Sequence, residues 1–265
     1  MNAWVSLLKK ELRLGMSAFL GPIITFVILT VVAGYIGSRN GFTWEVVQGV
    51  ALFATGFQIF YLVYYMLTSL QAERKNLHLW LHSPMPGYGL LLAKLVAGFI
   101  SMLLTLFVTG TTLLIALNQS VLFSEHLQLI DVTSVSFFGG THLILLALTF
   151  GIYAIFYWMI FLLINRHLGS FLSFLATIAI FTLLTTIFNA FKETSLYGLL
   201  TQWGEIQLTG ITESIGFSMN LETGTEVMTE VGNLSLYLGV YLIETVIAIL
   251  LFVAACWMLD RKVEV

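Results

Sequence analysis

Residues 88–117, with the sequence YGLLLAKLVAGFISMLLTLFVTGTTLLIAL, form an apolar run whose only charged residue is Lys94. A helix of about 20 apolar residues crosses the hydrocarbon core of a bilayer, so this run is long enough to span and to begin in the interface. Backbone polar groups must be satisfied within the segment there, which makes an α-helix the expected form. Five other runs have a similar character: 17–37, 46–70, 138–165, 168–191 and 236–259. The sequence therefore predicts an all-α membrane protein with six transmembrane helices.

The composition supports this fold class. Of the 265 residues, 58% are hydrophobic and 9% are charged, whereas soluble domains carry about 25% charged residues. A soluble globule of this size leaves too much surface exposed to hide so many apolar side chains. Six helices and their connections use the whole length, and no linker or repeat divides it. We expect residues 1–265 to form a single transmembrane domain, with the first span retained rather than cleaved as a signal peptide.

The placement of basic residues predicts the orientation. Six spans put nine Lys and Arg residues on the side of the two termini and two on the opposite side. The nine are Lys9, Lys10, Arg13, Arg74, Lys75, Lys94, Arg166, Arg261 and Lys262, and the two are Arg39 and Lys192. Cytoplasmic loops carry the excess of Lys and Arg, so both termini should be cytoplasmic.

Residues 2–17 have the pattern of an amphipathic helix that lies in the membrane interface. Leucines and Trp4 occupy one side, and the basic residues occupy the other: Lys9, Lys10 and Arg13. Basic side chains then meet anionic headgroups while the tryptophan enters the acyl boundary. Glu11 breaks the pattern because it lies among the apolar residues. It is either an exception at a frayed or snorkelling position, or it has a partner inside the protein.

The cytoplasmic segment 73–87, ERKNLHLWLHSPMPG, should form a short helix along the membrane face. It begins with charged residues and stops at Ser83, because the following Pro84 disfavours helix in the residue before it. Leu77, Trp80 and Leu81 lie on one side of such a helix. This side is suited to docking a soluble partner, although the bilayer is also able to absorb it.

The connection 192–235 before the last span is long and rich in apolar residues. Long connections are commonly functional or disordered, and this composition argues against disorder. We expect short helices or a re-entrant hairpin that covers the outer side.

Several polar side chains lie within the spans, where they usually mediate contacts between helices. One stripe is in the second span: Thr55, Gln58, Tyr61, Tyr65 and Thr68. Another is in the fifth: Thr182, Thr185, Thr186 and Asn189. Glu244 is the one acidic residue within a span, and it serves either a substrate or proton path or a structural hydrogen bond.

The order of these parts resembles the permease subunits of ABC-2 type exporters. Lys10, Glu11, Leu12 and Arg13 are similar to the N-terminal interface-helix signature of that family. A second pattern of the family joins an acidic residue, a leucine-rich helix, a Ser/Thr-Pro pair and a following lysine. The matching residues here are Glu73, Leu77, Leu81, Ser83, Pro84 and Lys94.

The resemblance implies an exporter of the bacterial plasma membrane in which two six-helix subunits, identical or sister chains, meet at a central path. The polar residues of spans two and five would line that path. Segment 73–83, with Trp80 on its docking side, would receive force from a cytoplasmic ATPase. The chain has no G-x-x-x-x-G-K-[ST] phosphate loop, so ATP and Mg²⁺ are expected to bind a separate partner subunit and no cofactor is expected in this chain.

Two other functional classes remain open at this stage. An ATP-independent secondary transporter would use Glu244, and it usually needs carboxylates near the midplane. A membrane-embedded enzyme would need convergent reactive side chains, which the spans scarcely offer, and we expect no catalytic residue. His78 and His82 are four residues apart, but no third ligand follows them, so we expect no metal site. Lipids, hydrophobic peptides and amphipathic drugs suit the apolar spans equally as cargo, and nucleic acid is not an expected partner.

Overall fold

The computed structural model describes residues 3–74, 86–120, 132–208, 213–220, 224–231 and 234–261. Eight α-helices are assigned within these ranges: α1 (Ala3–Leu14), α2 (Met16–Asn40), α3 (Thr43–Phe57), α4 (Tyr61–Arg74), α6 (Gly87–Gln119), α8 (Val132–Lys192), α9 (Ser195–Thr201) and α10 (Leu238–Arg261). A 3₁₀ turn, η1 (Gln58–Phe60), joins α3 directly to α4. A helix, α1, is present where the interfacial helix was expected, and Gly15 separates it from α2.

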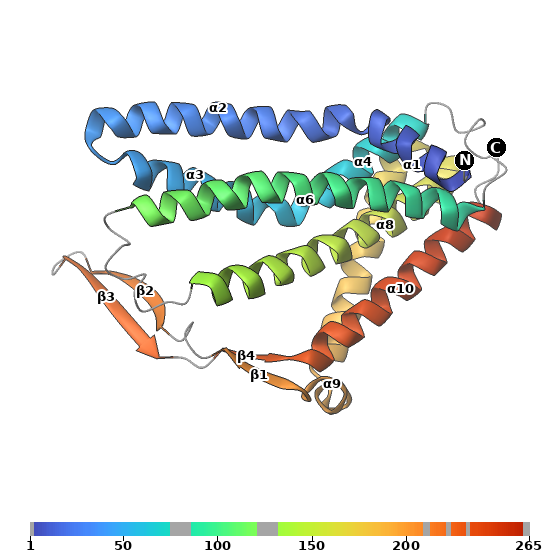
Figure 1. Cartoon of the computed structure of the whole chain (residues 1–265). Helices are drawn as coiled ribbons and strands as arrows, with labels where there is room; N and C mark the ends of the chain where they lie inside the picture. Colours follow the sequence, from blue (N-terminus) through green and yellow to red (C-terminus); the bar gives the residue numbers. More distant parts are fainter. Residues whose placement is uncertain are drawn as a thin grey trace.

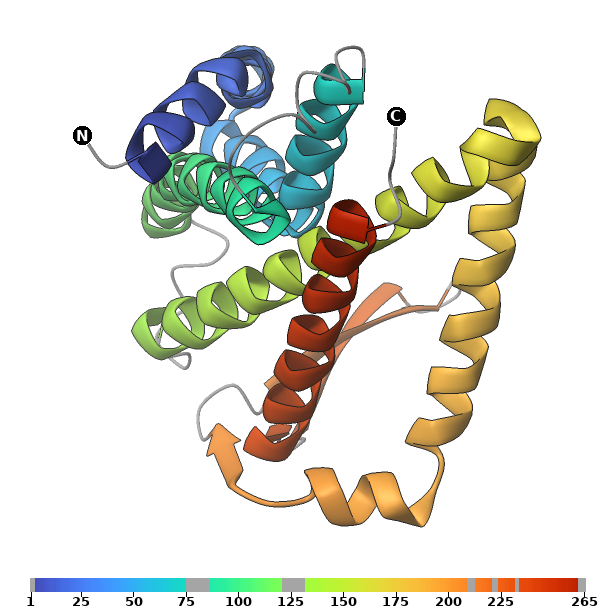
Figure 2. The ribbon, with the colours of Figure 1, turned by 90° about the vertical axis from the view of Figure 1, so that its right-hand side faces the viewer.

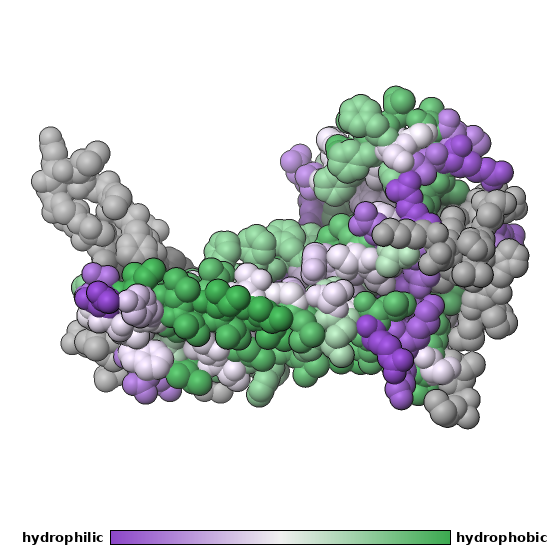
Figure 3. Space-filling view, turned by 90° about the horizontal axis from the view of Figure 1, so that it is seen from above, coloured by the Kyte–Doolittle hydropathy of each residue, from purple (hydrophilic) through white to green (hydrophobic). Residues whose placement is uncertain are grey.

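Five helical segments are long and apolar enough to cross a membrane: Met16–Asn40, Thr43–Arg74, Gly87–Gln119, Ser136–Lys192 and Leu238–Arg261. Figure 1 shows α2, α3 and α6 running side by side along much of their lengths. The surface over α2 is a continuous apolar stretch between hydrophilic ends, as expected of a lipid-facing helix (Figure 3). The prediction of a membrane-embedded helical protein is confirmed to this extent.

The longest helix, α8, is not straight. Gly169 has φ 73° and ψ 167°, outside the helical region, and splits α8 into a first half before it and a second half after it. A positive φ of this kind is accessible to glycine because it has no Cβ. The two halves diverge from a sharp corner (Figure 2). The two spans expected at 138–165 and 168–191 correspond to these halves, and the count of six spans depends on both halves crossing the bilayer.

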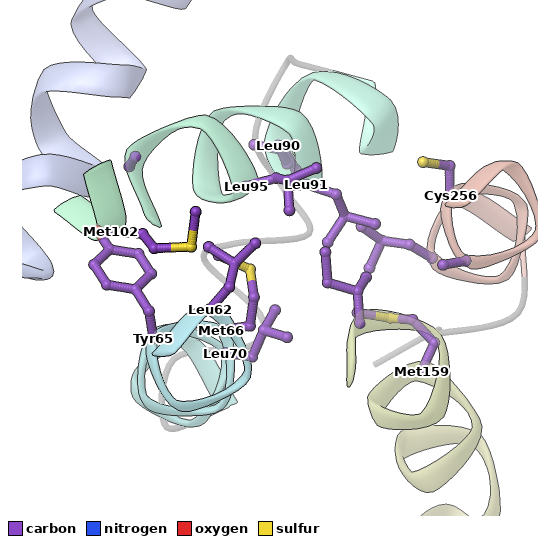
Figure 4. Packing of buried hydrophobic residues seen from close by; sticks show 14 of the residues in the cluster. Leu62, Tyr65, Met66, Leu70, Leu90, Leu91, Leu95, Met102, Met159 and Cys256 are labelled. Atoms are coloured by element: carbon purple, nitrogen blue, oxygen red, sulfur yellow. The ribbon is translucent and has the colours of Figure 1, made fainter. Parts of the chain in front are cut away.

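The core lies where α4 meets α6, α8 and α10. Figure 4 shows Leu62 and Met66 of α4 facing Leu91 of α6, with Met159 of α8 and Cys256 of α10 beside them. These buried side chains belong to four helices that are distant in the sequence. Their contacts hold α4, α6, α8 and α10 together.

Two glycines allow helices to approach α4 closely. A Cβ added at Gly98 of α6 would lie 2.7 Å from Tyr65, and one added at Gly151 of α8 would lie 2.6 Å from Leu62. Small residues at such crossings permit the close backbone packing that drives helix association in membranes.

The segment after α8 differs from the expected helical or re-entrant connection. Only α9 is helical, and the described remainder forms two antiparallel strand pairs: β1 (Glu205–Leu208) with β4 (Leu234–Tyr237), and β2 (Glu213–Asn220) with β3 (Gly224–Val231). In the second pair Glu213 is opposite Val231 and Asn220 is opposite Gly224. The physical reason is visible in 224–231, GTEVMTEV, where Thr or Val recurs at every second position. Such alternation of β-branched residues favours a strand.

Candidate functional site

Glu11 of the interfacial helix has a partner inside the protein. Its carboxylate Oε2 lies 2.7 Å from Nζ of Lys94 on α6, and both side chains are 1% exposed. Of the two interpretations of Glu11, the structure therefore favours an internal partner over a frayed position. A buried charge is very costly unless it is paired and hydrogen-bonded, which explains why an acid interrupts the apolar side of α1.

Two further groups complete this charge cluster, which we define as Glu11, Ser69, Glu73 and Lys94. The Lys94 ammonium donates to the Ser69 hydroxyl at 3.0 Å and to Glu73 Oε1 at 3.4 Å. The Ser69 hydroxyl in turn donates to Glu11 at 3.4 Å. An ammonium has three donors, and Glu11, Ser69 and Glu73 accept them.

The charges of the cluster are balanced by one residue at its edge. Glu11 and Glu73 carry two negative charges against the single positive charge of Lys94. Lys10 lies 3.4 Å from Glu73, and its side chain is 54% exposed. The formal charges of the cluster and Lys10 therefore sum to zero. Of the two lysines, Lys10 is the one that is accessible from outside the protein.

The cluster joins three elements that are far apart in the sequence. Glu11 belongs to α1, Glu73 to the last turn of α4, and Lys94 to the second turn of α6. The Tyr65 hydroxyl of α4 adds a hydrogen bond to the backbone carbonyl of Glu11 at 3.3 Å. A Cβ at Gly15 would overlap the Tyr65 ring, so only glycine allows α1 to turn into α2 at this place.

The residue next to Glu73 connects α4 to the corner of α8. The Arg74 guanidinium donates to the Ser170 hydroxyl at 3.1 Å and lies 5.2 Å from the centre of the Phe161 ring. Ser170 follows Gly169 directly. The last two residues of α4 therefore contact two different parts of the molecule, the charge cluster and the α8 corner.

The predicted docking segment follows these contacts in the chain. Glu73 is within the described residues, whereas Leu77, Trp80, Leu81, Ser83 and Pro84 lie outside them. On the far side of the segment, the backbone N–H of Gly87 donates to the Asp260 carboxylate near the end of α10 at 2.8 Å. Both flanks of segment 75–85 are thus fixed to packed helices.

The other residues singled out in α1 are at least partly accessible. Lys9, Lys10 and Arg13 are exposed, and Trp4 is half-buried. Sequence reasoning missed Ser69, although a signal was present. Ser69 precedes Glu73 by four residues, and side chains at this spacing lie on the same face of a helix.

The residues predicted to line a path do not meet at one place. Tyr65 is buried in the core, while Gln58 and Tyr61 line a pocket between α2, α3 and α6. Thr55 is half-buried, and its hydroxyl has no partner among the described residues. The stripe on the second half of α8 is exposed: Thr182, Thr185, Thr186 and Asn189.

Glu244 has a polar partner at the end of α8. Its carboxylate lies 3.6 Å from Lys192 Nζ, with side-chain exposures of 26% and 37%. Nearby, the Tyr241 hydroxyl is 2.8 Å from Nδ1 of His142 in the first half of α8. These contacts tie α10 to both halves of α8, in agreement with a structural role for Glu244.

Comparison with protein-family models, with curated proteins and with solved structures finds no match for this chain. The functional interpretation consequently depends on the geometry of the charge cluster and its neighbours.

Proposed function

We propose that this chain is the membrane subunit of an ATP-driven exporter of the ABC-2 type, coupled to separate ATPase subunits that bind ATP and Mg²⁺. The observation that carries the proposal is the charge cluster beside segment 75–85. The three ionisable residues that resemble the family motifs, Glu11, Glu73 and Lys94, come from separate parts of the sequence and meet within 3.4 Å.

The cluster suits the transmission of force. Taking charges out of water costs several kcal/mol per ion, so Glu11 and Lys94 are strongly held to one another once buried. A displacement of α4 at Glu73 then moves α1 and α6 with it. A motor that docks on segment 75–85 pushes on a unit of three helices rather than on one flexible loop.

Arg74 extends this transmission to α8. Because Arg74 contacts Ser170 and Phe161, the same displacement reaches the corner at Gly169. We propose that each half of α8 crosses the bilayer, which gives six spans, cytoplasmic termini and a cytoplasmic corner in the bacterial plasma membrane. The cationic residue Arg166 next to the corner fits this side by the positive-inside rule.

A second permease subunit, identical or a sister chain, covers the second half of α8 in this proposal. The polar stripe at Thr182, Thr186 and Asn189 is exposed in the single chain. Polar side chains in membrane helices are favoured at contacts between helices rather than toward lipid. The cargo is then a hydrophobic or amphipathic molecule.

The test is co-purification with a motor. The tagged chain is isolated from its native membranes in mild detergent, and vanadate-sensitive ATP hydrolysis is measured in the eluate. We expect an ATPase subunit with a phosphate-loop motif to be retained. Trp80→Ala should reduce its retention. Trp44→Ala is the matched control, because Trp44 is 40% exposed and lies at the start of the span Thr43–Arg74, whereas segment 75–85 follows the end of that span.

Two results would contradict the proposal. The first is an intact, stable chain that retains no nucleotide-hydrolysing partner. The second is retention that survives in Trp80→Ala, in Leu77→Ala and in the double variant, which would remove segment 75–85 as the motor contact.

A further inference from the structure

An apolar pocket lies between α2, α3 and α6, away from the charge cluster. Its volume is about 780 Å³. Ligand pockets occupy roughly 300–1,000 Å³. The hollow is therefore large enough to hold a ligand.

The wall of the pocket is aromatic and opens toward lipid. Phe53 and Phe57 line it, with ring centroids 5.0 Å apart, and they are 69% and 56% exposed. Phe60 continues the row at 5.7 Å from Phe57. With this exposed aromatic wall turned toward lipid, a molecule would enter the pocket sideways from the membrane.

The floor of the pocket is polar. Gln58 is 6% exposed and Thr105 is 1% exposed, and both line the hollow. They lie about half-way along their spans, where a polar group that lacks a partner is costly. Gln58 is also the first residue of η1, and 3₁₀ turns within a long helix often mark functional positions.

The amide of Gln58 has unused hydrogen-bonding capacity. A glutamine side chain has two donors and two acceptor sites. Among the described residues its side chain makes one hydrogen bond, with the Thr105 hydroxyl at 3.1 Å. That hydroxyl also lies 2.8 Å from the Met102 carbonyl, to which it is able to give its single proton. The remaining amide capacity is available to a molecule in the pocket.

None of the described residues that line the pocket is charged. A ligand that brought a charge to this depth would leave it unpaired, which disfavours fatty acids and ammonium compounds. A hydroxyl group, by contrast, both donates and accepts, so it satisfies the amide in either of its two orientations.

From these observations we infer that the pocket binds a neutral amphiphile from the bilayer, with a long apolar chain along the phenylalanines and a hydroxyl group on Gln58. This site is separate from the motor contact, and its occupancy requires neither an ATPase nor nucleotide.

Two glycines allow the pocket to be filled without disturbing its walls. Gly21 of α2 and Gly49 of α3 line it, and a Cβ added at either position meets nothing within 4 Å. A leucine at either lining position has room to extend into the hollow. Gly110 of α6 has the same free space but does not line the pocket, so Gly110→Leu is the matched control.

The experiment uses the purified full chain in phosphatidylcholine nanodiscs. Three photoreactive probes of equal chain length are compared: a hexadecanol, a hexadecane and a palmitate, each with a diazirine in the chain. Crosslinked positions are found by mass spectrometry, and unlabelled hexadecanol serves as competitor. We expect saturable labelling of α2, α3 or α6 by the alcohol, and weaker, non-saturable labelling by the other two probes.

The variants then distinguish the pocket from general contact with lipid. Gln58→Leu should reduce saturable labelling by the alcohol about tenfold, the effect of about one hydrogen bond, and leave hexadecane labelling unchanged. Gly21→Leu and Gly49→Leu should abolish the saturable component, and Gly110→Leu should retain it. Each variant is first checked for an unchanged melting temperature.

Any of three results would overturn the inference: alcohol labelling that does not saturate, equal labelling by hexadecanol and hexadecane, or unchanged alcohol labelling in the folded Gly49→Leu variant. If Gln58→Leu does not fold, the two glycine variants still decide the matter. The proposed exporter function is untouched by failure here, because it is tested by retention of the motor.

Discussion

The ammonium of Lys94 lies 2.7 Å from the carboxylate of Glu11, and 1% of each side chain is exposed. This pair joins the amphipathic helix α1 to the start of the long apolar helix α6. The attraction between two charges is strongest where water is excluded, but so is the penalty for losing one partner. The stability of the cluster should therefore depend on its completeness.

Removing Lys94 alone should strongly destabilise the fold. Lys94→Met leaves Glu11 and Glu73 buried without their shared partner, and breaking a buried pair in this way costs about 3–5 kcal/mol. Thermal unfolding in detergent measures the loss. Lys10→Met is the control, because Lys10 is exposed and such pairs contribute about 0–1 kcal/mol. Equal effects of the two substitutions would show that the cluster is not effectively buried.

Replacing the three ionisable residues of the cluster separates stability from coupling. The triple variant Glu11→Leu, Glu73→Gln and Lys94→Met leaves no buried charge of the cluster unpaired, although the exposed Lys10 loses its partner, and such replacements are often neutral or stabilising. We expect its melting temperature to recover relative to Lys94→Met, while stimulation of the partner ATPase by cargo stays low. Full stimulation in the triple variant would contradict a coupling role for the cluster.

The two glycines that contact α4 should resist enlargement. Gly98→Val and Gly151→Val place a β-branched side chain against Tyr65 or Leu62, and overpacking of this kind costs about 1–3 kcal/mol. Each should lower the melting temperature and the yield of folded protein. Gly110→Val is the matched control, because a Cβ there meets nothing within 4 Å. A larger loss in Gly110→Val would show that helix propensity, rather than contact with α4, explains the effect.

Labelling from each side of the membrane tests whether α8 crosses twice. Cys256, the single native cysteine, is buried and is replaced by alanine to give a clean background. A cysteine at His167 should be labelled from the cytoplasm only, and one at Ser195 from outside only. Both residues are exposed in the structure. If the second half of α8 does not cross, the two positions are labelled from the same side.

The pair formed by Glu244 and Lys192 should contribute little to stability. The two side chains are 26% and 37% exposed, and a double-mutant cycle with Glu244→Gln and Lys192→Met should give a coupling energy below about 1 kcal/mol. We also expect Glu244→Gln to leave stimulation of the partner ATPase unchanged. A selective loss of that stimulation, at unchanged melting temperature, would instead favour a role for Glu244 in transport.

The sequence predicted the helical part of the fold well, for a physical reason. Long apolar runs have few stable forms in a bilayer, because their backbone groups find no other partners. The anomaly at Glu11 was also visible, since an acid among leucines requires an explanation. Its partner was not identifiable from spacing, because the contact joins residues 83 positions apart.

The strands and the pocket show where sequence reasoning was insufficient. In 224–231 the alternation of Thr and Val was present, but the apolar content of the surrounding connection favoured a helical interpretation. The pocket depends on how α2, α3, α4 and α6 pack together, which is a property of the tertiary structure and not of any local pattern. Gln58 was singled out as part of a polar stripe, yet its neighbour Thr105 on α6 was not.

The position of Lys94 in the chain has a consequence for biosynthesis. A lysine at the centre of an apolar helix costs about 2.5–3.5 kcal/mol when the helix enters the membrane, and Lys94, near the start of α6, carries a smaller part of that cost. Glu11, Ser69 and Glu73 all precede Lys94, so the groups that neutralise it have already left the ribosome when it emerges. All members of the charge cluster lie within residues 3–119, so the cluster is able to close before α8 and α10 are synthesised.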